Sequence, residues 1–178
     1  VSTNVTIRTA IGGGRGYGPT HSQSIEPIIA SIPNIKIISP SHFHNPGELL
    51  EHSVLSESGI KIFCEYKMNY SRNISNQEDL IEGLSVNYSS GNYPSAFISN
   101  CDFVNPDISI ISHGGNMILI EKLMIDLLID FELGVNAVIP SILKPLPIDD
   151  ISTGIEGSEF TLIIEESPKD FGWGSEVL

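Results

Sequence analysis

The sequence predicts an α/β protein made of two Rossmann-like three-layer units, each built on a mainly parallel sheet. Three observations lead to this prediction. Strand-like and helix-like segments alternate through residues 5–64, and a second alternation runs through residues 107–164. Such alternation is typical of parallel strands that are connected by right-handed crossovers. Apolar residues make up 40% of the 178-residue chain, which favours a buried core over disorder.

The first unit is expected at residues 1–66. Short β-branched runs predict strands at residues 5–10, 35–38 and 60–64. A helical pattern predicts a helix at residues 22–31, which ends before Pro33. A second helix is expected to begin at Asn45, because Asn caps free N–H groups well and Pro46 suits the first helical position.

Residues 67–106 are rich in Asn, Ser and Tyr, and their periodicity is weak, so we interpret them as an interdomain linker with some strand content. The second unit is expected at residues 107–178. It should contain strands at residues 108–111, 135–139 and 160–164, and a short helix near residues 149–153. A long helix is expected at residues 116–133. Its apolar face is predicted to include Leu119, Leu123, Leu127 and Phe131, which are spaced four apart, joined by Ile120, Met124 and Leu128.

The composition excludes several classes of partner. The formal net charge is −13, which argues against binding to nucleic acid or to anionic membrane surfaces. Two cysteines, Cys64 and Cys101, are too few for a disulfide framework, so we expect a reducing compartment: the cytoplasm, or the mitochondrial matrix in a eukaryote. No apolar run is long enough to predict a membrane span.

The loop from Gly12 to Gly18 contains five glycines and lies between a predicted strand and a predicted helix, where phosphate-binding loops occur. It does not match the dinucleotide fingerprint, since Pro19 stands where the third glycine is required, and no Gly-Lys-Ser/Thr closes it. His21 follows at the expected helix start. A helix dipole there would lower its pKa and favour proton transfer near pH 7, although a capping or core histidine is the other interpretation.

The other candidate residues carry weaker signals. His42 and His44 share one side of a strand-like segment, which allows a metal site, but surface positions are the preferred interpretation. His52 and His113 lack the spacing of metal ligands. The pair Glu165-Glu166 ends a predicted strand. Paired acids there are usually solvated, although strand ends are also where α/β proteins build sites.

Several stretches resemble a known family. The run from Ile7 to Ser24, which includes Gly-Tyr-Gly-Pro-Thr-His-Ser-Gln-Ser, is similar to the beta subunits of thiamine-diphosphate-dependent 2-oxo-acid dehydrogenases. The likeness continues at residues 32–41 and 58–66. Residues 106–114, 143–146 and 164–176 are similar to the transketolase C-terminal domain. The resemblance implies that residues 1–66 are the C-terminal half of a pyrimidine-binding domain and that residues 107–178 are a truncated transketolase C-terminal-like domain.

The resemblance also implies a function. The parent enzyme would decarboxylate pyruvate or a branched-chain 2-oxo acid oxidatively and pass the acyl group to a lipoyl arm. His21 matches the histidine that acts in that transfer, and Arg8 with Gly14, Gly16 and Gly18 would form its supporting shell. The implied partners are an alpha-type subunit or domain, a second beta-type copy and a lipoyl-bearing acyltransferase.

Two departures limit what this chain is expected to do by itself. The family's cofactor-activating glutamate lies upstream of the matched region, and the alpha-type domain holds the diphosphate and magnesium. We therefore expect no tight binding of thiamine diphosphate by the fragment alone, which should be inactive. Some relatives hold potassium near the positions of Val5 and Thr6, but Ser56 stands where an aspartate ligand is expected.

Two alternative functions remain open. A transketolase-like or deoxyxylulose-phosphate-synthase-like transferase would need basic residues for sugar phosphates, and the chain has only nine. A non-catalytic assembly module of the same fold is the second alternative.

Overall fold

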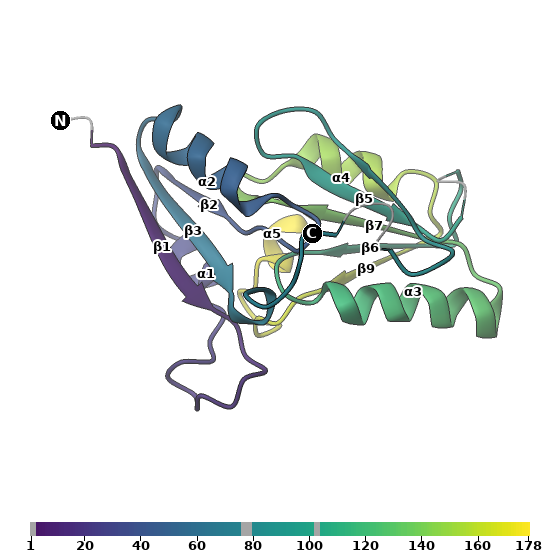
Figure 1. Ribbon diagram of the computed structural model, residues 1–178. Helices are drawn as coiled ribbons and strands as arrows, with labels where there is room; N and C mark the ends of the chain where they lie inside the picture. The colour runs from purple at the N-terminus through teal and green to yellow at the C-terminus, as the bar shows by residue number, and fades with distance from the viewer. Residues whose placement is uncertain (1–2, 76–79, 102–103) are drawn as a thin grey trace.

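The computed structural model describes residues 3–75, 80–101 and 104–178, and it confirms the α/β class with two sheets of mainly parallel strands (Figure 1). The first sheet has the order β1-β3-β2-β8 and the second β4-β5-β7-β6-β9. The strands of the first sheet are β1 (Val5–Ile11), β2 (Ile35–Ile38), β3 (Ile60–Tyr66) and β8 (Ile142–Lys144). Those of the second are β4 (Ser85–Tyr88), β5 (Ser95–Ser99), β6 (Ile108–Ser112), β7 (Val135–Pro140) and β9 (Phe160–Ile164).

Two helices cover opposite faces of the first sheet. Neighbouring residues of a strand point to opposite faces. Ile37 of β2 packs in the cluster that includes Ile29 of α1 (Glu26–Ala30), whereas Ile38 packs with Leu49 of α2 (Pro46–Leu55). β1 and β2 both pair with β3 in parallel, so their carboxyl ends lie at one edge of the sheet.

The predicted start of α2 is confirmed, but the predicted start of α1 is wrong. Asn45 caps α2 through its Oδ1, which accepts from the Gly47 and Glu48 N–H groups at 3.1 and 3.3 Å. The helix expected at residues 22–31 is shorter in the structure, where α1 spans only Glu26–Ala30. The Gln23 carbonyl instead accepts the Gly12 N–H at 3.0 Å, so this backbone closes the glycine-rich loop and does not begin a helix.

The second sheet begins within residues 67–106. β4 and β5 pair antiparallel with each other, and β5 pairs antiparallel with β7 at the sheet's centre. The strand content expected there therefore belongs to the second sheet, while the division into domains at residues 66 and 107 stays a prediction. A strand that the sequence did not reveal, β8, pairs antiparallel with β2 and so carries the chain back to the first sheet.

The long helix is present, and its predicted apolar face is confirmed at Ile120, Met124, Leu123 and Leu127 but is wrong at Leu119 and Phe131. α3 (Met117–Phe131) buries Met117, Ile120 and Met124 against the second sheet. Leu119 and Phe131 were expected on that face and are 69% and 67% exposed. The helix is apolar around most of its circumference, so spacing alone does not select the side that packs.

The remaining helices are α4 (Ile148–Ile155), which overlaps the short helix expected near residues 149–153, and α5 (Gly174–Val177). One core cluster joins the two sheets, with Ile11 and Tyr66 from the first and Ile111 and Val138 from the second. Within the described residues, no helix is both long and apolar enough to cross a membrane. Cys64 and Cys101 are both free.

Candidate active site at the glycine-rich loop

The glycine-rich loop leaves the carboxyl end of β1 and projects from the body of the molecule (Figure 1). Four hydrogen bonds hold its neck. Gly12 N–H donates to the Gln23 carbonyl at 3.0 Å, and Gly13 N–H donates to Oε1 of Glu166 at 2.5 Å. The Lys67 ammonium donates to the Gly12 carbonyl at 3.2 Å and also to the His21 carbonyl. The neck is therefore fixed from the ends of β1, β3 and β9.

The tip of the loop is open to solvent. Gly14, Gly16 and Gly18 all have left-handed φ values between +70° and +79°, a region that glycine enters without steric cost. His21 is exposed, and its N–H donates to the Gly18 carbonyl at 3.3 Å. Because α1 begins only at Glu26, the expectation that His21 sits at a helix N-terminus is wrong. The His21 side chain is accessible because it lies on an exposed part of the loop.

Beneath the neck lies a buried polar cluster that joins three elements. Tyr66 at the end of β3 donates its hydroxyl hydrogen to Oε1 of Glu26 on α1. The same hydroxyl lies 3.3 Å from Nδ1 of His113, which follows β6. Glu26, Tyr66 and His113 are at most 3% exposed, and the His113 ring also lies 5.0 Å from that of Trp173.

Burial shapes the protonation of this cluster. It raises the pKa of Glu26 and of Tyr66, because both would lose solvation as anions. Burial also lowers the pKa of His113 to about 4. We therefore expect a neutral imidazole and a neutral phenol at pH 7. Neither Oε2 of Glu26 nor Nε2 of His113 has a hydrogen-bond partner among the residues that the structure describes.

A pocket of about 470 Å³ opens beside the neck, and Ser22, Gln23 and Ile28 line it together with Glu166, Asp170 and Phe171. Its two ionisable lining residues are acidic. The neighbouring Glu165 accepts the N–H groups of Trp173 and Gly174, both at 3.0 Å, and so anchors the C-terminal segment. Glu166 accepts the Gly13 N–H, so it contacts the loop, and the assignment of the Glu165-Glu166 pair to a functional site stays a prediction.

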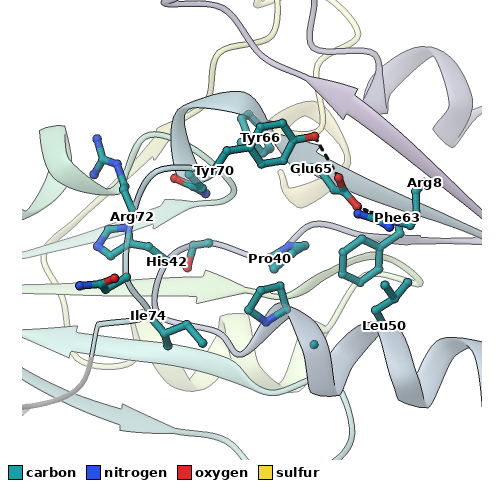
Figure 2. A pocket seen from close by; sticks show the side chains of 15 residues that line it. Arg8, Pro40, His42, Leu50, Phe63, Glu65, Tyr66, Tyr70, Arg72 and Ile74 are labelled. Carbon is teal, nitrogen blue, oxygen red and sulfur yellow. Dashed lines mark hydrogen bonds and ion pairs between the residues drawn. The ribbon is translucent and has the colours of Figure 1, made fainter.

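Arg8 lies at a second pocket, of about 400 Å³, beside α2 (Figure 2). Its guanidinium forms an ion pair with Glu65, which also accepts the Tyr70 hydroxyl at 2.9 Å. Phe63 and Leu50 form part of the apolar lining. Arg8 thus lines this pocket and pairs with Glu65 of β3, and its supporting role at the loop stays a prediction.

His42 and His44 are buried, so the expectation of surface positions is wrong. Nε2 of His42 lies 3.5 Å from Oε2 of Glu121 on α3. Nδ1 of His44 accepts the Ser41 N–H at 3.1 Å, and burial lowers the pKa of His44 to about 4. The segment is a turn and not a strand, and the described residues contain no group of three or more His, Cys, Asp or Glu arranged for a metal.

Curated relatives extend over nearly the whole chain. The chain is 28% identical to a Porphyra purpurea pyruvate dehydrogenase E1 component subunit beta, covering 98% of this chain and 49% of that protein. It is 24% identical to the same subunit of Staphylococcus aureus, with 98% and 50% covered. The beta subunit of acetoin:2,6-dichlorophenolindophenol oxidoreductase from Cupriavidus necator is 25% identical over 93% of this chain and 45% of its own. The chain is thus similar to these beta subunits over nearly its whole length.

The chain spans about half the length of the curated relatives it matches. No protein-family model matches it. Among solved structures, a split-gene transketolase described as an inactive beta4 tetramer gives a TM-score of 0.61 at 16% identity, covering 99% of this chain and 52% of that one. Transketolase from Leishmania mexicana gives 0.56 at 19% identity, with 92% and 23% covered. These neighbours confirm the transketolase-like fold.

Sequence reasoning placed His21, the glycines and the Glu165-Glu166 pair at the site but missed Lys67, Glu26 and Tyr66. One signal was available for Lys67 and Tyr66. Both stand at the carboxyl end of the strand parallel to β1, and the carboxyl ends of parallel strands meet at one edge. Nothing in the sequence pairs Glu26 with His113, because their proximity depends on how the two sheets pack.

Proposed function

We propose that this chain is the beta-type portion of a thiamine-diphosphate-dependent 2-oxo-acid dehydrogenase. The assembly would decarboxylate pyruvate or a branched-chain 2-oxo acid and transfer the acyl group to a lipoyl arm. Homology to E1 beta subunits supports this class of enzyme. The observation that carries the proposal is an exposed His21 on a loop whose neck is tied to the carboxyl ends of three strands.

The residues of this chain do not fit the diphosphate end of the cofactor. The pocket at the loop is lined by Glu166 and Asp170 and by no Lys or Arg, so it would repel an anion. The described residues also lack a cluster suited to magnesium. The diphosphate and magnesium would therefore be held by an alpha-type subunit or domain, and the fragment alone should be inactive.

The assembly would place His21 at the junction with the alpha-type partner. When bound there, thiamine diphosphate supplies the ring that stabilises the carbanion left by decarboxylation. In this chain, the His21 imidazole would donate or accept a proton, or a hydrogen bond, during acyl transfer to a lipoyl arm. The loop glycines let the backbone bend in the exposed segment that carries His21.

The same proposal includes a second beta-type copy and a lipoyl-bearing acyltransferase as partners, but not nucleic acid or a membrane. The free thiols support a reducing location, either the cytoplasm or the mitochondrial matrix. A potassium ion near Val5 and Thr6 is also proposed. Thr6 donates its hydroxyl hydrogen to the Ser53 carbonyl at 3.2 Å, close to Ser56 in the sequence.

His21→Ala tests the proposal in the assembly reconstituted with an alpha-type subunit. We expect reductive acylation of a lipoyl domain to fall by roughly 100-fold or more, the scale of an acid/base group. Decarboxylation measured with an artificial electron acceptor should be largely kept. His52→Ala, on α2, is the matched control and should leave both rates unchanged.

The same assay separates the alternatives. Unchanged acylation in His21→Ala would favour the non-catalytic assembly module. Turnover of ketose phosphates by the reconstituted protein, in place of 2-oxo acids, would favour a transketolase-like or deoxyxylulose-phosphate-synthase-like transferase. The acidic lining of the pocket at the loop argues against sugar phosphates.

A further inference from the structure

Lys67 occupies a special position at the neck of the glycine-rich loop. It is the first residue of the 3-10 turn Lys67–Asn69, directly after β3 ends at Tyr66. Its half-buried side chain donates to two carbonyls, those of Gly12 and His21, which stand nine positions apart in the sequence. One side chain thus bridges the entry of the loop and the residue proposed for catalysis.

The peptide group between Gly12 and Gly13 is held from both sides by opposite charges. Its carbonyl accepts from the Lys67 ammonium at 3.2 Å, and its N–H donates to the Glu166 carboxylate at 2.5 Å. The two groups of a trans peptide point in opposite directions, so these contacts fix the orientation of its plane. A charged donor and a charged acceptor on one peptide also polarise it, which strengthens both bonds.

Little else fixes the tip of the loop. Arg15 donates to the Ser71 hydroxyl at 3.4 Å, a long contact at an exposed position. A Cβ added at Gly16 or Gly18 would meet nothing within 4 Å. The contact between Lys67 and the His21 carbonyl is therefore a direct restraint on the backbone that carries the imidazole.

We propose that Lys67 is a positioning residue for His21, which it aims by joining the His21 carbonyl to the Gly12–Gly13 peptide at the loop's neck. The inference rests on the proposed function, because the orientation of the imidazole matters only if His21 acts in acyl transfer. Lys67 itself would touch neither substrate nor cofactor. Its effect would pass through the backbone of residue 21.

The first test measures the loop itself in the 178-residue chain. Lys67→Met keeps the aliphatic stem and removes the donors, Lys67→Arg restores donors, and Lys122→Met removes an exposed lysine of α3 as the charge control. Amide hydrogen exchange at Gly12 should become about tenfold faster in Lys67→Met, the lower end expected for a lost charge-assisted hydrogen bond. Lys67→Arg should stay near the parent, and Lys122→Met should match it.

Core amides distinguish positioning from a general structural role. Exchange at Ile37 and Ile110, buried in the two sheets, should not change in any of the three variants. If core and loop amides accelerate together in Lys67→Met, Lys67 acts on global stability and the inference fails. It fails equally if Gly12 exchange is unaltered.

The second test uses the reconstituted assembly and separates this inference from the proposed function. Lys67→Met should lower kcat of lipoyl acylation about tenfold, with decarboxylation and the KM for the 2-oxo acid kept, and Lys67→Arg should recover most of the loss. If decarboxylation and the KM for the 2-oxo acid change together with kcat of acylation, the positioning role is overturned. If His21→Ala leaves acylation unchanged while Gly12 exchange still responds to Lys67→Met, the proposed function fails and the loop restraint stands.

Discussion

The buried His113 should make the stability of this protein depend on pH. Its side chain is fully buried, and burial lowers its pKa from the ordinary 6.5 to about 4. Between these values the unfolded chain binds a proton that the folded chain does not, so unfolding is favoured as pH falls. The contribution of His113 to stability is thus present above about pH 6.5 and is lost as pH approaches 4.

The size of the effect follows from the pKa difference. One pKa unit corresponds to about 1.4 kcal/mol, so the whole window is worth about 3 kcal/mol. The sequence pI is about 4.6, so measurements should stop near pH 5.3 to keep the chain in solution. Over the range from about pH 7.5 to 5.3, the expected loss due to His113 is about 1.5 kcal/mol.

The perturbation that isolates this contribution is His113→Gln, which keeps a polar side chain beside Tyr66 but does not titrate. Urea unfolding at several pH values can be followed by the fluorescence of Trp173, the only tryptophan, whose ring lies 5.0 Å from that of His113. The free energy of unfolding of the parent relative to the variant should fall by about 1.5 kcal/mol from pH 7.5 to 5.3. Asn116→Ala, after the same turn, should keep the parent's pH dependence.

Parallel curves for the parent and His113→Gln would refute the reasoning. That result would mean that the imidazole is protonated in the folded protein with nearly its unfolded pKa, so that burial is compensated. The raised pKa of Glu26 acts in the opposite direction, because its carboxyl holds a proton in the folded state at pH values where the unfolded chain has lost it. Since both proteins keep Glu26, the comparison between them still reports His113.

Two further predictions concern local packing. Gly114→Ala should destabilise the chain by about 3 kcal/mol or more in urea unfolding, because its φ is +68° and a Cβ would lie 2.0 Å from the Tyr66 ring. Gly59→Ala, with φ +92° and open space around it, should cost only about 1 kcal/mol, and equal losses would show that the contact with Tyr66 relaxes freely. Asn45→Ala should remove the cap of α2 and lower the free energy of unfolding by about 1 kcal/mol, whereas an unchanged value would show that solvent replaces the cap.

Much of the fold could be predicted because local chemistry and tertiary structure agree. The β-branched runs at β2 and β9 form strands within the expected bounds, and Asn45-Pro46 begins α2 as expected. The family resemblance was also visible in the loop from Gly12 to Gln23, where glycines, histidine and polar residues follow one another closely. In these segments a few neighbouring residues determine the outcome.

The sequence-based predictions are wrong where contacts between distant segments determine burial or helix length. The buried side of α3 depends on which sheet it meets, and Leu119 is as apolar as the residues that pack. His44 and His113 carry no signal of burial in their own neighbourhoods, and His113 is buried between Tyr66 and Trp173, which are distant in the sequence. The length of α1 was overestimated because the Gln23 carbonyl bonds across the loop neck to Gly12, a contact that helical periodicity does not describe.

The arrangement of charges around the loop explains why rigid and open parts occur so close together. Lys67 and Glu166 act on one peptide at the neck, whereas Gly16 and Gly18 beyond it have open space around them. Under the proposed function, the exposed His21 with its anchored backbone would suit transfer to a lipoyl arm that must arrive and leave. The neutral, buried Tyr66 and His113 pack tightly below the neck and support the backbone there. A Cβ at Gly12 or Gly114 would already collide with the Tyr66 ring. Precision at His21 would therefore depend on residues that the imidazole never touches.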